Sequence, residues 1–152
     1  MPYLWLKWLH VLAAIVAVGA NVTYGIWIAR ASRTPEALPF TLRGIKLLDD
    51  RVANPAYGLL LVTGLLMVFV VRFPLTTPWL LTALVLYGVL VLVGLLGYTP
   101  TLRRQIQLLE SEGFGSPNYQ ALARRGTILG VVLTVLVIVI VFLMVVKPEL
   151  WA

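Results

Sequence analysis

The chain has 152 residues, of which 61% are hydrophobic and 12% are charged, and its formal net charge is +6. A soluble domain is about 25% charged, so this composition excludes a soluble domain of the ordinary kind. The chain has no cysteine, which excludes disulfides, iron–sulfur clusters, thiolate haem ligation and thiol catalysis. Its length predicts a single integral membrane domain over residues 1–152.

Four long apolar stretches predict an all-α fold, a bundle of four transmembrane helices. A helix needs roughly 20 apolar residues to cross the hydrocarbon, and lone sheet edges are not viable there. The expected spans cover about residues 3–29, 53–71, 79–98 and 127–146. We expect the third helix to continue past the membrane and to break between Gly113 and Pro117. The stretch 42–50 forms either a surface helix or the lead-in to the second span.

The basic residues lie mainly in two of the three connections between the spans. The first connection contains Arg30, Arg33, Arg43, Lys46 and Arg51, and the third contains Arg103, Arg104, Arg124 and Arg125. The positive-inside rule places both connections in the cytoplasm and both termini on the outer side, as in a multi-pass protein of the bacterial cytoplasmic membrane. The basic residues do not form the stripe of a nucleic-acid binder, so we expect them to contact anionic lipid.

His10 is the only histidine, and it lies within the first apolar stretch. A titratable side chain in hydrocarbon is costly, which makes it a candidate functional residue. Met67 and Met144 are expected at a matching depth near the outer surface. Imidazole and thioether groups bind haem and copper, so these three residues are candidate ligands of haem b or copper. The alternative, which we favour for His10, is a hydrogen bond to a neighbouring helix, with the methionines as packing.

A second polar cluster is expected nearer the cytoplasm, from Asn21, Asp50 and Asn54. At about 100° per residue, Asp50, Asn54 and Tyr57 share one face of a helix. Helical rise places this cluster too far from His10 for a histidine–carboxylate pair. An intramembrane carboxylate can belong to a proton or ion path. The alternative, which we favour, is that the acidic residues interact with the positive end of a helix dipole.

The fourth span carries small residues at a spacing of four: Gly126, Gly130 and Thr134. This stripe predicts close helix packing, either within the chain or in a homodimer. No catalytic triad, phosphate-binding glycine loop or HExxH metal motif is visible in the sequence. We therefore assign no catalytic residue and no metal site, and we lean against an enzyme.

Three segments resemble the bacterial membrane family called domain of unknown function 2269. They are YLWLKWLHVLAAI (residues 3–15), LLDDRVANPAYGLLLVTGLLM (47–67) and TTPWLLTALVLYG (76–88). The resemblance implies four spans and no assigned activity. The opening WLKWLHVLAAI also resembles the first helices of the copper-resistance CopD group and of HemJ-type protoporphyrinogen oxidases. In those families a first-helix histidine is linked to the handling of copper or haem, and His10 would be its counterpart. HemJ-type proteins also need a lysine in a later helix, which no later span here contains.

These observations lead to three hypotheses about function. The first is an accessory or assembly subunit of a larger membrane complex, including redox complexes, with other membrane subunits or further copies of the chain as partners. The second is a haem- or copper-binding redox protein that uses His10. The third is a proton-coupled transporter that uses Asp50.

Overall fold

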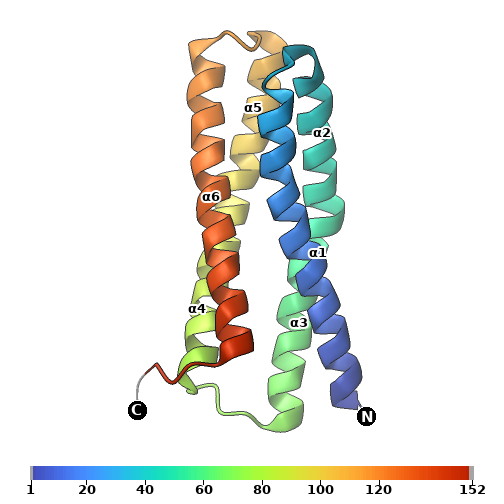
Figure 1. Cartoon of the computed structure of the whole chain (residues 1–152), viewed down its shortest axis with the longest axis vertical. Helices are drawn as coiled ribbons and strands as arrows, with labels where there is room; N and C mark the ends of the chain where they lie inside the picture. Colours follow the sequence, from blue (N-terminus) through green and yellow to red (C-terminus); the bar gives the residue numbers. More distant parts are fainter. Residues whose placement is uncertain (1, 151–152) are drawn as a thin grey trace.

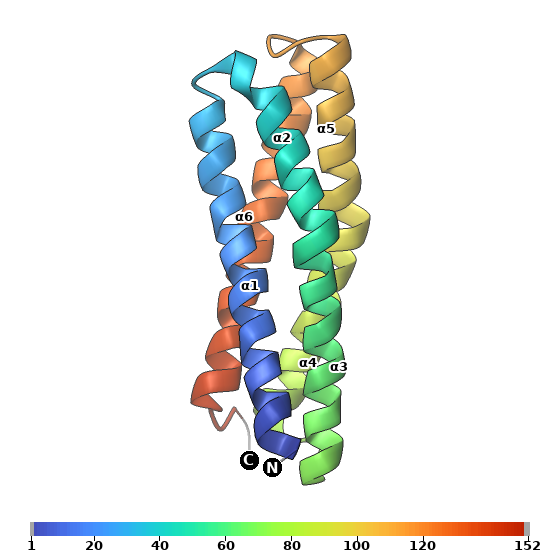
Figure 2. The ribbon, with the colours of Figure 1, turned by 90° about the vertical axis from the view of Figure 1, so that its right-hand side faces the viewer.

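The computed structural model describes residues 2–150, and every regular element in this part of the chain is helical. Four continuous helices are long and apolar enough to cross a membrane: Pro2–Ala31, Pro35–Val71, Pro78–Ser111 and Pro117–Val146. This confirms the all-α class and the number of helices that are long and apolar enough to be spans. The helices run side by side, with both chain termini at one end of the bundle (Figures 1 and 2). We call this the terminal end, and the opposite end, which carries connections 32–34 and 112–116, the loop end.

The first and last long helices are single elements, α1 (Pro2–Ala31) and α6 (Pro117–Val146). The second consists of η1 (Pro35–Ala37), α2 (Leu38–Leu48), η2 (Asp49–Ala53) and α3 (Asn54–Val71). The third consists of α4 (Pro78–Leu92), η3 (Val93–Tyr98) and α5 (Thr99–Ser111). The stretch 42–50 is therefore a lead-in to the second span, and the third helix continues well beyond its apolar part, as expected.

The two middle helices each contain a π-helical turn directly before a proline. The N–H of Asn54 donates to the carbonyl of Asp49, and the N–H of Thr99 donates to the carbonyl of Gly94. Pro55 and Pro100 follow these residues. Proline has no N–H, and its ring clashes with the carbonyl four residues earlier. A π-turn adds one residue to the helical turn. The helices therefore continue through both prolines, and the residues before each π-turn are shifted by one position relative to a straight α-helix.

The loop end is packed like a water-soluble helical domain. Leu38, Leu42 and Ile45 place one face of α2 in the core, and Leu102 and Leu109 do the same for α5. The opposite faces are charged. Arg43 Nη2 forms an exposed ion pair with Glu110 Oε1 at 2.7 Å. Amphipathic helices of this kind bury one stripe and expose the other to water, which is why these segments lie outside the four apolar stretches.

The break between α5 and α6 lies where the sequence predicts it. Gly113 has a φ of +83°, a conformation that favours glycine. Ser116 caps α6, because its hydroxyl accepts from the N–H of Tyr119. Hydrogen bonds from Ser116 and Asn118 to the Glu112 carboxylate lower the pKa of Glu112. These local bonds fix the turn and the start of α6.

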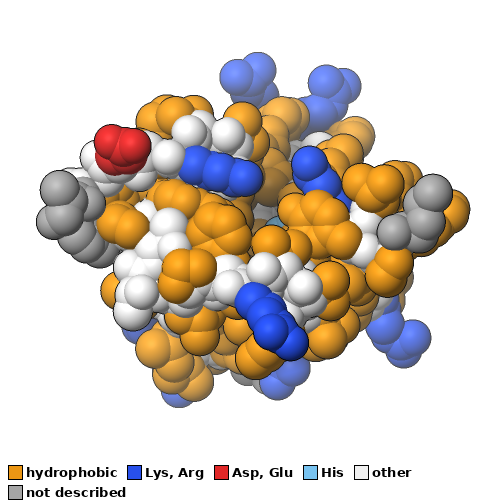
Figure 3. All heavy atoms as spheres, turned by 90° about the horizontal axis from the view of Figure 1, so that it is seen from below, with side chains coloured by type: hydrophobic (Ala, Val, Ile, Leu, Met, Phe, Trp, Pro, Cys, Tyr) orange, Lys and Arg blue, Asp and Glu red, His pale blue; other side chains and the backbone are white. Residues whose placement is uncertain are grey.

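The terminal end consists of two helix pairs, because α1 packs along α3 and α4 packs along α6. Small side chains occupy several of the buried positions here, including Ala13 and Ala17 of α1, Thr63 of α3 and Ala83 of α4. Viewed from this end, the surface is mostly hydrophobic and is hollowed near its centre (Figure 3). The two pairs diverge toward the termini, and the core of the bundle is concentrated at the loop end (Figure 1).

Candidate functional site

His10 forms a hydrogen bond with α3, the neighbouring helix of its pair. Its Nδ1 lies 2.9 Å from Thr63 Oγ1. The Thr63 hydroxyl in turn donates to the backbone carbonyl of Leu59 at 2.7 Å. A threonine hydroxyl has only one proton, so in the tautomer that fits both bonds Nδ1 of His10 donates to Thr63 and Nε2 carries no proton. The predicted interhelical hydrogen bond of His10 is thus present in the structure.

Gly64 makes the space that the His10 ring occupies. A Cβ built on Gly64 would lie 3.2 Å from His10 Cε1, which is tighter than ordinary van der Waals contact. Met67 lies one helical turn beyond Thr63 on α3, and Met144 lies near the end of α6. Within residues 2–150, no hydrogen bond joins His10 to either methionine. The sequence did not indicate that Thr63 or Gly64 contacts His10, because a threonine or a glycine in an apolar helix carries no signal of a particular partner.

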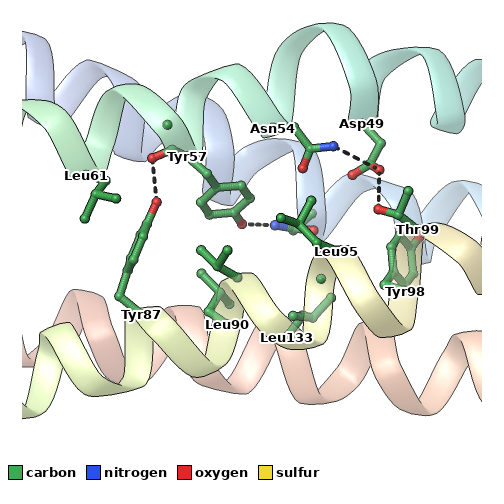
Figure 4. A pocket seen from close by; sticks show the side chains of 14 residues that line it. Asp49, Asn54, Tyr57, Leu61, Tyr87, Leu90, Leu95, Tyr98, Thr99 and Leu133 are labelled. Atoms are coloured by element: carbon green, nitrogen blue, oxygen red, sulfur yellow. Dashed lines mark hydrogen bonds between the residues drawn. The ribbon is translucent and has the colours of Figure 1, made fainter.

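The inner polar cluster forms around Asn21, in the loop-end half of α1. Asn21 donates from Nδ2 to the hydroxyl of Tyr57 on α3. Tyr87 of α4 donates its hydroxyl to the backbone carbonyl of Tyr57. The cluster thus joins helices of both pairs, and Figure 4 shows Tyr87 reaching across to the backbone of Tyr57. The sequence placed Tyr57 on the face of Asn54 without assigning it to the cluster, and it gave no indication of Tyr87.

Asp49, and not Asp50, is the carboxylate of the inner cluster. Asp49 is 6% exposed, and its Oδ2 accepts from Asn54 Nδ2 at 3.5 Å and from Thr99 Oγ1 at 3.3 Å. Asp50 is exposed and pairs with Lys46. The expected grouping of Asp50 with Asn54 assumed a straight α-helix. The π-turn inserts one residue between them, which places Asp49 over Asn54 and turns Asp50 outward.

A cavity of about 220 Å³ lies between η2–α3 and α4–η3, beside this cluster. Asp49, Asn54 and Thr99 line one end, as Figure 4 shows. Three tyrosines and several aliphatic side chains line the remainder, namely Tyr57, Tyr87, Tyr98, Leu61, Leu90, Leu95 and Leu133. Both π-turns contribute to its wall. π-turns occur often at functional sites, so this cavity is the main candidate site of the molecule.

The small-residue stripe of α6 packs partly within the chain. A Cβ on Gly126 would lie 3.3 Å from Gln105 Oε1 of α5, and one on Gly130 would lie 3.9 Å from Tyr98. Thr134 donates its hydroxyl to the carbonyl of Gly130 in its own helix. The same three residues border a groove of about 390 Å³ between α1 and α6. The stripe therefore allows α6 to approach its neighbours closely and leaves part of its face open.

The part of the chain described here, residues 2–150, holds no group of three or more histidine, aspartate or glutamate side chains placed to bind a metal ion. No curated protein and no solved structure matches the chain. The family described as "predicted integral membrane protein", domain of unknown function 2269, matches residues 4–148. This match covers nearly the whole chain and all four long helices. The chain therefore belongs to this family of integral membrane proteins.

Proposed function

We propose that the protein is an accessory or assembly subunit of a larger membrane complex, and that a helix of a partner subunit lies in the groove between α1 and α6. The composition of the groove supports this. Small residues of both helices and of the connection after α1 line it, namely Gly25, Ala29, Ser32, Gly126, Gly130 and Thr134. Membrane helices associate where small residues let their backbones approach. A Cβ on Gly25 would meet no described atom within 4 Å, so this side of α1 has room for a partner.

Purification in a mild detergent followed by native mass spectrometry tests the proposal. We expect the wild-type chain to copurify with at least one other membrane polypeptide. Gly25→Leu should release that partner, because the new side chain fills the groove. Gly19→Leu is the matched control, since Gly19 lies on the same helix, has equally open surroundings and does not line the groove. A monodisperse monomer, a homodimer alone, or equal release by both variants would contradict the proposal.

We also propose that the protein lies in the bacterial inner membrane with its loop end in the cytoplasm. Nine of its twelve lysine and arginine residues lie between residues 30 and 51 or between 103 and 125, on the loop-end halves of the helices and their connections. Cytoplasmic connections are enriched in such residues. Fusions at the C-terminus test this orientation. Alkaline phosphatase should be active there and green fluorescent protein dark, and the reverse pattern would reject it.

A second candidate function is the binding of haem b or copper through His10. The hydrogen bond to Thr63 supports it, because ligating histidines are commonly oriented by a bond at their other ring nitrogen. Nε2 of His10 would be the ligand atom, and Met67, Met144 or a partner subunit would supply another. The group would contribute electron transfer. No observation favours transport through Asp50, which pairs with Lys46 at an exposed position.

Absorption spectra and metal analysis test the cofactor proposal. Protein from cells supplied with haem and copper should show a Soret band or bound copper, which His10→Ala should remove. Thr63→Val should retain the group with a shifted spectrum, because it removes only the orienting bond. Wild-type protein with neither a Soret band nor copper would reject this function.

A further inference from the structure

The carboxylate of Asp49 forms no salt bridge within the part of the chain that the structure describes. Its two hydrogen bonds both end on Oδ2 and are long, at 3.3 and 3.5 Å. Its Oδ1 accepts none within residues 2–150. Lys46, one turn earlier, pairs with Asp50 instead. A buried charge is costly unless it is paired. A cationic donor at Oδ1 would therefore stabilise this carboxylate.

The polar groups near Asp49 also have unused hydrogen-bonding capacity. Tyr57 accepts at its hydroxyl from Asn21, and the hydroxyl proton of Tyr57 has no acceptor within residues 2–150. Tyr24 is 3% exposed, and its hydroxyl has no hydrogen-bond partner among the described residues. Tyr24, Asn21 and Tyr98 line the groove between α1 and α6, and Asn21 and Tyr98 also line the Asp49 cavity. Polar groups with unused hydrogen-bonding capacity therefore lie between the two spaces.

The lining of the cavity indicates the chemistry of its ligand. A negative group at one end and tyrosine rings along the walls favour a cation, because aromatic faces attract positive charge. Unfilled acceptor positions on Asp49 favour a cation that carries N–H donors over a quaternary one. The aliphatic side chains of Leu90 and Leu95 favour an apolar portion next to the charge. A volume of about 220 Å³ suits a small group of this kind.

We propose that this cavity binds a primary ammonium group, through Asp49 and the tyrosines that line it. The group belongs either to a small alkylamine or to the headgroup of an aminophospholipid. Thr99, which contacts Asp49, lies four residues, about 6 Å along the helix, before Arg103. The cavity thus lies close to the arginine-rich edge of the apolar region, at a depth that both sources of ammonium can reach.

The full chain in maltoside micelles, which contain no ammonium group, provides the test. Binding of n-butylammonium is measured by isothermal titration calorimetry, with tetramethylammonium and sodium ions as comparison cations. Retention of phosphatidylethanolamine against phosphatidylglycerol is measured by native mass spectrometry. Asp49→Asn should weaken binding by about tenfold or more, because it removes a charge-assisted hydrogen bond. Asp50→Asn, which removes the adjacent exposed carboxylate, should change binding by less than about twofold.

A second pair of variants tests the cavity without changing any charge. Gly58 lines the cavity, and a Cβ there meets no described atom within 4 Å. Gly58→Leu should therefore fold, fill the space and abolish binding. Gly88→Leu is the matched control, since Gly88 has equally open surroundings and lies outside the lining. If Asp49→Asn does not fold, this pair decides the question.

The outcomes separate the sources and the alternatives. Binding of butylammonium alone assigns a free amine, and selective retention of phosphatidylethanolamine assigns the lipid. Either kind of binding supports the proposal if it is lost in Gly58→Leu and retained in Gly88→Leu. Three results would overturn it: no binding of either probe, equal binding of tetramethylammonium or sodium, or equal loss in Asp50→Asn and Asp49→Asn.

Discussion

The loop end and the terminal end of the bundle are built from the same four long helices, but different interactions hold each end together. At the loop end, amphipathic helices α2 and α5 bury leucines in a shared core and expose charged faces. At the terminal end, small side chains and single hydrogen bonds such as His10–Thr63 connect helices that are apolar on all sides. Burial of apolar side chains stabilises helix packing where the alternative is exposure to water. It contributes little within the membrane, because lipid tails are as apolar as leucine. The surroundings thus decide which interaction holds each end together.

The largest expected effect separates leucines that are equally buried at the two ends. Leu42 of α2 is 0% exposed at the loop end, and Leu80 of α4 is 4% exposed at the terminal end. We expect Leu42→Ala to lower the free energy of unfolding by about 2–5 kcal/mol, as in water-soluble cores. Leu80→Ala should cost about 1 kcal/mol or less, because lipid or detergent replaces the lost contacts.

Unfolding by sodium dodecyl sulfate in mixed micelles, followed by circular dichroism, measures both variants. If Leu42→Ala and Leu80→Ala lowered the free energy of unfolding by similar amounts, the two ends would not differ in the way described.

A smaller effect is expected where polar bonds matter most, at the terminal end. Thr63→Val removes the partner of His10 without much change in volume, and should cost about 1 kcal/mol. Thr82→Val is the control, because within residues 2–150 the hydroxyl of Thr82 donates to Pro78 of its own helix and to no other helix. The same unfolding titration applies. If Thr82→Val lowered the free energy of unfolding as much as Thr63→Val, the bond to His10 would have no special role.

The smallest expected effect is a pH dependence confined to the loop end. Hydrogen bonds from Ser116 and Asn118 lower the pKa of Glu112. A carboxyl whose pKa is lower in the folded state contributes stability above its ordinary pKa and loses it as the pH falls through the lowered value. The melting temperature should therefore fall slightly below about pH 4.

In Glu112→Gln the melting temperature should no longer fall over this pH range, and its pH dependence elsewhere should be unchanged. A profile of unchanged slope would mean that the turn does not depend on the ionised carboxylate.

Much of the fold follows from the sequence, because long apolar runs have few alternatives in a membrane. The four long apolar helices, the continuation of the third helix and the break at Gly113 are confirmed. The second and fourth helices begin earlier than the expected spans, at Pro35 and Pro117. Hydropathy finds the membrane-crossing part of a helix but not an amphipathic extension of it. The side of the membrane on which the termini lie stays a prediction.

The candidate site was predictable only in part, and one residue of register explains the difference. Asn21 and Asn54 belong to the inner cluster, but Asp49 takes the place expected for Asp50, and Tyr87 and Thr99 come from the third helix. The signal was present in Pro55 and Pro100, since a helix that continues through a proline needs a local adjustment. Periodicity at 100° per residue cannot show which adjustment a helix makes.

The reactivity of single cysteines tests this register most directly, because the natural chain has no cysteine. Asp49→Cys and Asp50→Cys are each treated with a water-soluble maleimide in the folded protein. We predict rapid labelling of Asp50→Cys, and labelling of Asp49→Cys that is slower by about tenfold or more, because thiol reactivity follows exposure. Equal rates, or faster labelling of Asp49→Cys, would contradict the π-turn and with it the cavity built around Asp49.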